Sequence, residues 1–471
     1  MPSALFSYLS VTVLFTLAAQ ALPDKIYGVN LGSWLVLESW MLPAEWISMG
    51  GQQCNDCSQC IASEFAFAEV YPDTVDEKFK THWESWFNQP DVDQLVNSGI
   101  NTVRVPLGYW IVEPLVNRTS EFYPRGGIVE LQRGLKQLKA AGIAAILDHH
   151  ALPGVATSGQ EFAGRCTNDV EFYTPYNYHR ALIWTAVMTA LSHLDPDFGS
   201  VAAIEAMNEP IMNANQTPGL GGFQVNFVET VRAVELILGI PVPGVSSFFE
   251  FQLAPNVAAA FSTASNLTSI FNSEVRQVLI DTIPVLAHVA AQLGLNTDFD
   301  DGGLRFSLAE RKPLTTTIMD INWQYNNPAN PANAAIGPQV YDNHLYYSFG
   351  GVADANEEAY LTSVCNLDRI QSDAALGNSP LVFGEWGLPT QFNATDEFLV
   401  KWRMHRSFLI PRALDGSSFW NFKVEISELA GDLARQWSYR EGIRLGYLTQ
   451  DPSKLHDPNV CAPYITNSTS P

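Results

Sequence analysis

Eight short apolar segments, each followed by polar residues, constrain the fold of this chain most strongly. Stretches with helical spacing lie between several of them, and strands that alternate with helices form parallel sheets. Eight such units favour an α/β fold, a closed (β/α)8 barrel of the TIM type, in which residues just past the strand ends form the active face. The expected strand ends are Gly32, Val105, Asp148, Met207, Ile321, His344, Glu385 and Asn421.

The chain between the fourth and fifth expected strands is longer than a barrel requires. Residues 211–313 hold two helical stretches, 223–238 and 273–293, on either side of a segment rich in Pro, Ser and Phe around 241–251. This interval lacks the strands needed for a separate sheet, so we predict one barrel domain over residues 22–471 with a long insertion. Further helices are expected over residues 76–87, 91–98, 128–141, 178–194, 357–370 and 397–409.

The first 21 residues have the pattern of a signal peptide. They contain no charged side chain, are almost wholly apolar from Leu5 to Ala19, and end in Ala-Gln-Ala, which predicts cleavage after Ala21. A membrane anchor is the alternative, but the apolar run is short for a membrane span. Five glycosylation sequons agree with secretion. They begin at Asn117, Asn215, Asn266, Asn393 and Asn467.

The charge balance narrows the class of partner. The chain has 49 acidic and 26 basic residues, for a net charge of −23. Nucleic acids and anionic membrane surfaces would be repelled, so neither is expected as a partner. A neutral sugar polymer is not repelled, and the aromatic side chains (12 Trp, 16 Tyr, 26 Phe) include rings that could stack on sugars, although most are expected in the core.

Six cysteines leave two interpretations. The cluster Cys54, Cys57 and Cys60 has a spacing that a metal site could use. An even count in a secreted chain favours disulfides instead, which would also involve Cys166, Cys365 and Cys461. The connectivity stays open, since six cysteines allow fifteen pairings.

Two glutamates that follow buried strands are the main catalytic candidates. Glu209 lies in Asn-Glu-Pro and Glu385 in Gly-Glu-Trp. A single glutamate at a strand end is commonly solvated or half of an ion pair. Two of them, with aromatic residues nearby, match the paired carboxylates of a glycosidase, in which one donates a proton and the other attacks the sugar.

Three further features have both a structural and a functional interpretation. Glu38 lies among apolar residues and is either paired with an arginine or an acceptor for sugar hydroxyls. Arg104, near a strand end, could hold a site carboxylate, pair structurally, or do both. His149 and His150 must point to opposite faces of their strand, so at most one faces the site, and a zinc site would need more ligands than the following loop offers.

Six motifs in barrel order resemble glycoside hydrolase family 5, a retaining family on a TIM barrel. Within that family the chain is similar to the fungal β-glucanases, both β-1,6 and exo-β-1,3. Residues 45–50 with 63–65, 123–127 and 172–178 favour the β-1,6 group, whereas His149, Ala151, the triple cysteine and residues 241–251 depart from the family pattern. The six motifs span residues 28–38, 101–106, 208–210, 344–346, 384–386 and 419–421.

The resemblance implies a role for each candidate residue. Glu209 would be the acid/base, held protonated near neutral pH, and Glu385 the ionised nucleophile. Arg104 and Tyr346 would orient Glu385, and Asn208 would bond the sugar 2-hydroxyl. His150 and His344 would contact hydroxyls or carboxylates, and Glu38 would accept hydrogen bonds from sugar hydroxyls at the −1 position. Trp420 would form the aromatic floor beneath that sugar.

The expected protein is therefore a secreted, monomeric, retaining β-glucan hydrolase that needs no metal or cofactor. Linkage preference is expected to be β-1,6 first and exo-β-1,3 next. It would act outside the cell or at the cell wall. There are two alternatives. One is a transglycosylase that remodels cell-wall glucan, because it forms the same covalent intermediate as a retaining hydrolase. The other is a glucan-binding barrel without turnover, because it has the same fold.

Overall fold

The structure is a computed structural model of the whole chain. It describes residues 21–245, 254–268, 270–298, 311–323, 326–454 and 459–466, together with Leu308 and Asp457, and between 406 and 415 it describes the backbone alone. The expected signal peptide up to residue 20, the sequon at Asn467 and most of the segment around 241–251 lie outside the described residues.

Eight parallel strands form one closed barrel in the order β1 to β8, which confirms the predicted TIM-barrel fold. Each strand pairs in parallel with its neighbours in sequence, and β8 closes the ring by pairing with β1. The strands are β1 Ile26–Asn30, β2 Thr102–Gly108, β3 Ala144–Ala151, β4 Val201–Glu205, β5 Thr315–Met319, β6 Gln339–Leu345, β7 Leu381–Trp386 and β8 Leu414–Phe419.

The barrel interior changes from apolar to charged along the strands. Side chains of a strand alternate between its two faces, so every second residue points inward. On β3 an apolar residue, Ile146, precedes Asp148 and His150, and on β6 Val340 precedes Asp342 and His344. Ile26, Ile146, Ala203, Val340 and Val382 form a separate buried apolar cluster. The interior thus holds an apolar layer below a polar one at the carboxyl ends.

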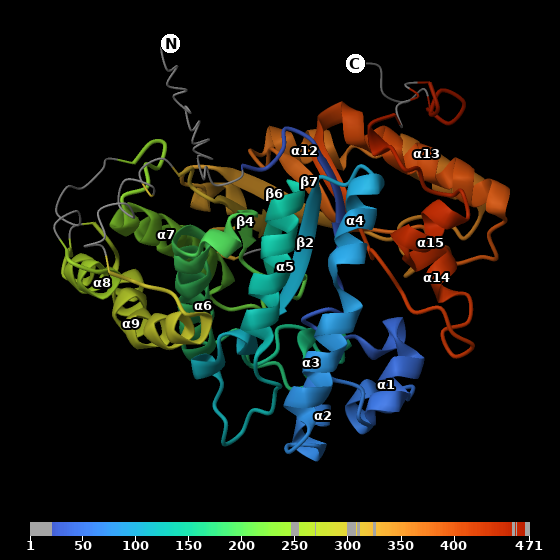
Figure 1. Cartoon of the computed structure of the whole chain (residues 1–471). Helices are drawn as coiled ribbons and strands as arrows, with labels where there is room; N and C mark the ends of the chain where they lie inside the picture. The colour runs from blue at the N-terminus through green and yellow to red at the C-terminus, as the bar shows by residue number, and fades with distance from the viewer. Residues whose placement is uncertain are drawn as a thin grey trace, which may run out of the picture.

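Helices surround the barrel, as Figure 1 shows. Several begin at side-chain caps that the sequence supplies, such as Thr174 before α6 and Asn272 before α9, each accepting a hydrogen bond from a backbone N–H of the first turn. The helices are α1 Pro43–Met49, α2 Glu64–Val70, α3 Val75–Trp86, α4 Gln89–Asn97, α5 Gly127–Ala141, α6 Pro175–Leu194, α7 Leu220–Leu238, α8 Val257–Ser265, α9 Ser273–Leu293, α11 Glu357–Cys365, α12 Arg369–Ala375, α13 Asp396–Ala413, α14 Leu433–Trp437 and α15 Tyr439–Arg444.

Several expected strand ends and one expected helix differ from the structure. The first, fourth and eighth strands end at Asn30, Glu205 and Phe419, each two residues before the expected end. The helix expected over residues 357–370 is two helices, because α11 is capped at Asn366 and α12 begins at Arg369. The fifth strand ends at Met319 rather than Ile321, since residues 321–323 form a short 3-10 turn. Apolar spacing alone does not show such breaks.

The insertion after β4 packs on the outside of the barrel. Its helices α7 and α9 both contact α6, and α8 contacts α9 and α7. Figure 1 shows these four helices grouped at one side of the barrel. The prediction of an insertion that adds no second sheet agrees with the described residues, whose eight strands all belong to the barrel.

Three disulfides use all six cysteines, as the even count predicted. They join Cys54 to Cys60, Cys57 to Cys166 and Cys365 to Cys461. The first closes a small ring in one loop, whereas the other two connect segments about a hundred residues apart in sequence. Among the helices that the structure describes, none combines the length and the apolar character required to cross a bilayer.

Candidate active site

Glu209 and Glu385 come to the same mouth of the barrel from different strands. Glu385 lies within β7 and is 5% exposed. Glu209 follows β4, and its φ of 35° lies in the left-handed region that side-chain-bearing residues rarely adopt. Backbone strain of this kind is common at functional sites, where the surrounding structure holds it.

The two carboxylates lie close together. Oxygen atoms of Glu209 and Glu385 and a ring nitrogen of His344 all lie within 4.8 Å of one another. Retaining glycosidases have catalytic carboxyl groups about 5 to 5.5 Å apart, whereas inverting enzymes leave about 6.5 to 9.5 Å for a water molecule. The separation of the two carboxylates is therefore closer to the retaining spacing than to the inverting one.

Each oxygen of Glu385 accepts a hydrogen bond from a different neighbour. Arg104 Nη1 donates to Oε1 at 2.9 Å, and the Tyr346 hydroxyl donates to Oε2 at 2.8 Å. Charge-assisted bonds of this type fix the orientation of a carboxylate. The structure thus brings together Glu385 and the two residues that the sequence analysis placed around it.

Arg104 is also the centre of a buried ionic network below the site. Its Nε donates to Glu205 at 2.8 Å, its Nη2 lies 3.1 Å from Asp148, and Asp342 lies 3.7 Å from Nε. These carboxyl groups come from β3, β4 and β6, so the single arginine connects strands around the barrel. Burial raises the pKa of Glu205 well above its ordinary value, although Arg104 opposes this effect.

Asp342 approaches the strand beside it closely enough to require a glycine. Its Oδ1 accepts a hydrogen bond from the Gly384 N–H at 2.6 Å, and a Cβ at position 384 would lie 1.9 Å from Oδ2. The glycine directly before Glu385 therefore allows Asp342 to lie between the strand backbone and Arg104. His344 also lowers the pKa of Asp342, against the raising effect of burial.

Glu209 is paired with His344, which changes its expected protonation. His344 Nδ1 lies 2.7 Å from Glu209 Oε1. Burial raises the pKa of Glu209, but the hydrogen bond and charge of His344 outweigh it, so the pKa lies below its ordinary value. Burial lowers the pKa of His344, but Glu385, Asp342 and Glu209 together raise it well above its ordinary value. The sequence predicts a proton on Glu209, whereas the directions of these two shifts favour the proton on the imidazole in the free site.

The two adjacent histidines lie on opposite faces of β3, as predicted. His150 faces the site, where its Nδ1 lies 2.5 Å from Asp148 and its ring is parallel to Trp420 at a centroid distance of 5.7 Å. His149 faces outward and stacks on Trp184 of α6 at 3.9 Å. Burial lowers the pKa of His149 to about 3, so it is a neutral packing residue and not part of the site.

Asn208 and Glu38 complete the predicted set. Asn208 Oδ1 accepts a hydrogen bond from Arg104 Nη2 at 2.9 Å, beside the Glu209 backbone. Glu38 is 6% exposed, and its Oε2 accepts a hydrogen bond from the Trp40 indole at 3.0 Å. Burial raises the pKa of Glu38 to about 8, and the charges of nearby glutamates add to the effect. Near neutral pH the Glu38 carboxyl therefore both donates and accepts.

Seven of the nine predicted site residues, all except Arg104 and His344, line a cavity of ≈ 510 Å³ at the barrel mouth. Glu38, His150, Asn208 and the two glutamates form its polar base. Ring systems form much of the remaining surface, and flat rings stack on the apolar faces of sugars. The aromatic lining consists of Trp40, Phe162, Tyr346, Phe349, Trp420 and Trp437.

Several site residues were not identified from the sequence. Asp148 and Asp342 each lie two positions before a predicted histidine, so strand alternation already placed them on the same inner face. Glu205 carried the signal of a carboxylate inside an apolar strand. The aromatic residues of the rim, Phe349 and Trp437, gave no such signal, because they lie in loops or short helices where periodicity gives no face.

Among the described residues, Glu209, His344 and Glu385 are close enough to hold a metal ion. Burial lowers the pKa of His344, but Glu385, Asp342 and Glu209 raise it well above its ordinary value, which favours the protonated imidazole, and a protonated nitrogen has no lone pair for a metal. The donor set therefore fits a proton-transfer site better than a metal site.

The closed barrel with paired glutamates, a buried arginine clamp and an aromatic cavity defines the class of protein, an O-glycosyl hydrolase. The sequence profile of the cellulase family, glycosyl hydrolase family 5, matches residues 72–424. The chain belongs to this family, as the sequence motifs indicated.

Several fungal proteins are similar to this chain over most of its length. Glucan endo-1,6-beta-glucosidase B of Emericella nidulans is 27% identical over 450 residues, which cover 93% of this chain and 88% of the relative. A probable glucan endo-1,6-beta-glucosidase B of Aspergillus fumigatus is 28% identical over 89% of this chain and 87% of the relative. A probable glucan 1,3-beta-glucosidase A of Aspergillus niger is 32% identical, over 39% of this chain and 41% of the relative.

A solved structure confirms the fold. Rutinosidase from Aspergillus niger superposes with a TM-score of 0.57 at 17% identity and covers 90% of this chain and 98% of the rutinosidase. At that identity the likeness concerns the barrel architecture alone.

Proposed function

We propose that the protein hydrolyses cell-wall β-glucan with retention of configuration, with Glu385 as nucleophile and Glu209 as acid/base. The observation that carries this proposal is the pair of carboxylates within 4.8 Å at the mouth of the barrel. A sugar ring over this pair would stack on the aromatic cavity surface, and its hydroxyls would meet Glu38, His150 and Asn208.

In the first step an oxygen of Glu385 attacks the anomeric carbon and forms a glycosyl ester. The bond to the leaving oxygen breaks, and Glu209 delivers a proton to that oxygen. This proton is the one that the Glu209–His344 pair shares: transfer across the 2.7 Å contact leaves a neutral imidazole and a neutral carboxyl. A sugar that displaces water from the cavity favours this neutral pair, because burial disfavours charges.

In the second step a water molecule attacks the anomeric carbon from the side of Glu209. Glu209 takes the proton of that water and passes it back to His344, and the bond to Glu385 breaks, which restores both carboxylates and the protonated imidazole. Arg104 and Tyr346 stabilise the carboxylate of Glu385 as it leaves, because both donate to its oxygens. Asn208, which Arg104 holds by a hydrogen bond, would bond the 2-hydroxyl, a contact that strengthens in the transition state.

β-1,6-Glucan is the proposed substrate. The support is similarity along nearly the whole chain to fungal proteins named endo-1,6-beta-glucosidases, against similarity over a shorter segment to a 1,3-beta-glucosidase. Incubation with β-1,6-glucan, β-1,3-glucan and cellulose, followed by analysis of the released sugars, tests this preference. Fastest release from β-1,6-glucan supports it, and fastest release from either other polymer contradicts it.

Substitution of each glutamate separates the two proposed roles. Glu385→Gln should abolish turnover of every substrate while leaving sugar binding intact, because no nucleophile remains. Glu209→Gln should lose turnover of glucan but keep much more activity on a dinitrophenyl glucoside, whose leaving group needs no protonation. Equal losses on both substrates in Glu209→Gln would contradict its role as the acid.

Two alternatives are distinguished by the same assays. A transglycosylase would yield longer oligosaccharides at high substrate concentration, because another sugar intercepts the ester in place of water. A glucan-binding barrel without turnover would bind the polymer and release nothing. We also propose that the protein acts outside the cell, since its three disulfides are typical of an oxidising compartment and agree with the expected signal peptide.

A further inference from the structure

One wall of the cavity is built from two tripeptides of different loops. Residues 38–40 follow β1, and residues 160–162 follow β3. The outer residues of both tripeptides line the cavity, while their central residues, Ser39 and Glu161, do not. These two central residues are bonded to each other, so the contact between them joins the two halves of the wall.

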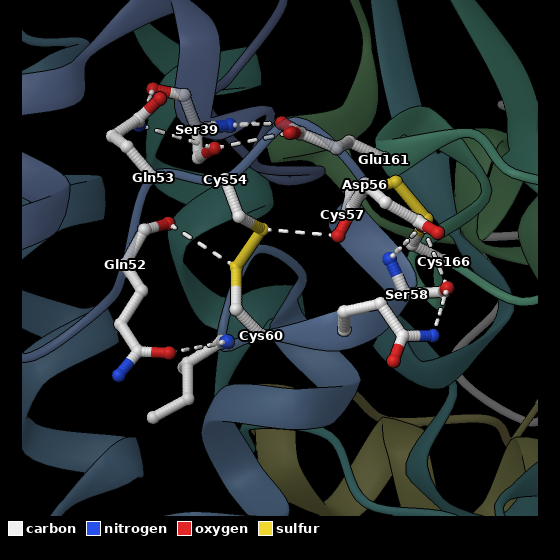
Figure 2. Close-up of a disulfide and its surroundings, with 12 residues drawn as sticks. Ser39, Gln52, Gln53, Cys54, Asp56, Cys57, Ser58, Cys60, Glu161 and Cys166 are labelled. Atoms are coloured by element: carbon white, nitrogen blue, oxygen red, sulfur yellow. Dashed lines mark hydrogen bonds between the residues drawn. A yellow bond between two sulfur atoms is a disulfide. The ribbon is translucent and has the colours of Figure 1, made fainter.

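The joint is a carboxylate that accepts two hydrogen bonds from one residue. Glu161 Oε2 accepts from the Ser39 N–H at 2.6 Å, and Oε1 accepts from the Ser39 hydroxyl at 3.1 Å, as Figure 2 shows. Gln53 supports Ser39 from the other side, since its amide donates to the Ser39 carbonyl at 3.2 Å and to the hydroxyl at 3.3 Å. Ser39 itself is 1% exposed. Two bonds to one carboxylate fix both distance and orientation.

A disulfide connects the same two loops. Cys57 belongs to the segment after β1, and Cys166 follows the second tripeptide by four residues. A backbone bond from Phe65 to Gly164 of 3.1 Å adds a further tie. The neighbouring disulfide, Cys54 to Cys60, closes a ring within the first loop only (Figure 2). The chain therefore offers a disulfide that crosses between the loops and a matched one that does not.

We propose that Glu161 is a positioning residue that sets the width of the substrate cavity, with the Cys57–Cys166 disulfide as its covalent brace. This inference rests on the proposed glucan hydrolysis. Through Ser39, Glu161 holds Glu38 and Trp40 at a fixed distance from Phe162 on the facing tripeptide. Loss of the joint would misplace these sugar contacts without touching Glu209 or Glu385. The effect therefore belongs to substrate binding more than to the chemical step.

The first test compares substitutions of Glu161 on the glucan that the wild-type protein hydrolyses fastest. Glu161→Ala should raise KM about tenfold or more, because weakened hydrogen bonds to the sugar reduce binding by about that factor, with a much smaller change in kcat. Glu161→Gln should restore KM, because its carbonyl still accepts from the Ser39 N–H and its amide donates to the hydroxyl. The control is Glu171→Ala, an exposed glutamate of the same loop, which should leave KM unchanged.

The second test compares the two disulfides. The double substitution Cys57→Ser with Cys166→Ser should raise KM on the same glucan, whereas Cys54→Ser with Cys60→Ser should not. Assays run below the unfolding temperature of each variant. Calorimetric titration of an oligosaccharide of that glucan into the Glu385→Gln protein, with and without Glu161→Ala, measures the same loss as a weaker Kd in the absence of turnover.

The outcomes separate this inference from the proposed function. A wild-type protein that hydrolyses no β-glucan contradicts the proposed function. An active wild-type protein together with a Glu161→Ala variant of unchanged KM contradicts the positioning role alone. If Glu161→Ala does not fold, the comparison of the two disulfide double variants tests the inference instead. Equal KM values in these two variants would overturn it.

Discussion

At the residue scale, the orientation of the Glu385 carboxylate depends on two hydrogen-bond donors from different parts of the barrel. Arg104 holds one oxygen from below the site, and Tyr346 holds the other from the loop after β6. Arg104 also ties Asn208 and Glu205 to the same point, so its substitution would disturb the whole base of the site. Tyr346 is better suited to a test, because substitution by Phe removes the hydroxyl group alone.

Tyr346→Phe should lower kcat/KM on glucan by about 10- to 150-fold, the cost of a hydrogen bond to a charged group of about 1.5 to 3 kcal/mol. The ring remains, so stacking in the cavity is preserved. The matched control is Tyr347→Phe, whose buried hydroxyl contacts Ser363 and not the site. Steady-state kinetics of both variants measure the difference, and equal activities would contradict the role of Tyr346.

The pairing of His344 with Glu209 predicts a change in the pH profile. In the wild-type protein the shared proton leaves at high pH, because the pKa of His344 is raised well above its ordinary value. In His344→Asn the proton is held by the Glu209 carboxyl alone. The basic limb of the kcat/KM profile should therefore move to lower pH. A profile whose basic limb does not move would show that the pair does not supply the proton.

At the scale of elements, helix α2 is anchored to the loop after β1 by a buried carboxyl. Glu64 Oε1 accepts a hydrogen bond from the Leu37 N–H at 2.8 Å, directly before Glu38. Burial raises the pKa of Glu64 to about 8 from an ordinary 4.5. Between these values the folded protein holds a proton that the unfolded chain releases, so this carboxyl makes stability fall as pH rises.

Glu64→Gln should reduce the pH dependence of stability. The amide keeps an acceptor for the Leu37 N–H but does not ionise, so the contribution of Glu64 between about pH 4.5 and 8 is lost. Thermal unfolding at pH 5 and pH 8 measures it: the fall in Tm between these values should be smaller in the variant. The same fall in both proteins would contradict the assignment of a buried, protonated Glu64.

Most helices could be predicted from the spacing of their apolar residues. The strands and the residues at the barrel mouth could be predicted for a different physical reason. Parallel strands buried on both faces are continuously apolar, so a polar residue at their end, such as Glu385 or His344, is conspicuous. Breaks such as that between α11 and α12 depend on local capping and were missed. The direction of the pKa shift of Glu209 could not be predicted either, because it depends on the contact with His344, a residue 135 positions away in sequence.

At the scale of the whole molecule, a disulfide ties the C-terminal segment back to the barrel. Cys461 lies 96 positions beyond Cys365, at the end of α11, and neither residue lines the active-site cavity. A cross-link over a loop of this length reduces the entropy of the unfolded chain. The bond therefore belongs to stability rather than to catalysis.

Substitution of both Cys365 and Cys461 by Ser should lower the free energy of unfolding by about 2 to 5 kcal/mol. The activity at 25 °C on glucan should stay near the wild-type value, because the cavity is not altered. Denaturant titration and kinetics measure the two quantities. An unchanged denaturation midpoint would contradict the role of this disulfide in stability. A loss of activity in the folded variant would contradict the claim that it has no role in catalysis.

The central claim is that Glu385 attacks the anomeric carbon of the sugar directly. Glu209, at the same mouth of the barrel, donates a proton to the leaving group. The most direct test is the configuration of the first product, read by proton NMR before mutarotation, with β-1,6-glucan as substrate. The account predicts that the newly released reducing end is the β-anomer. First appearance of the α-anomer would show inversion and contradict the account.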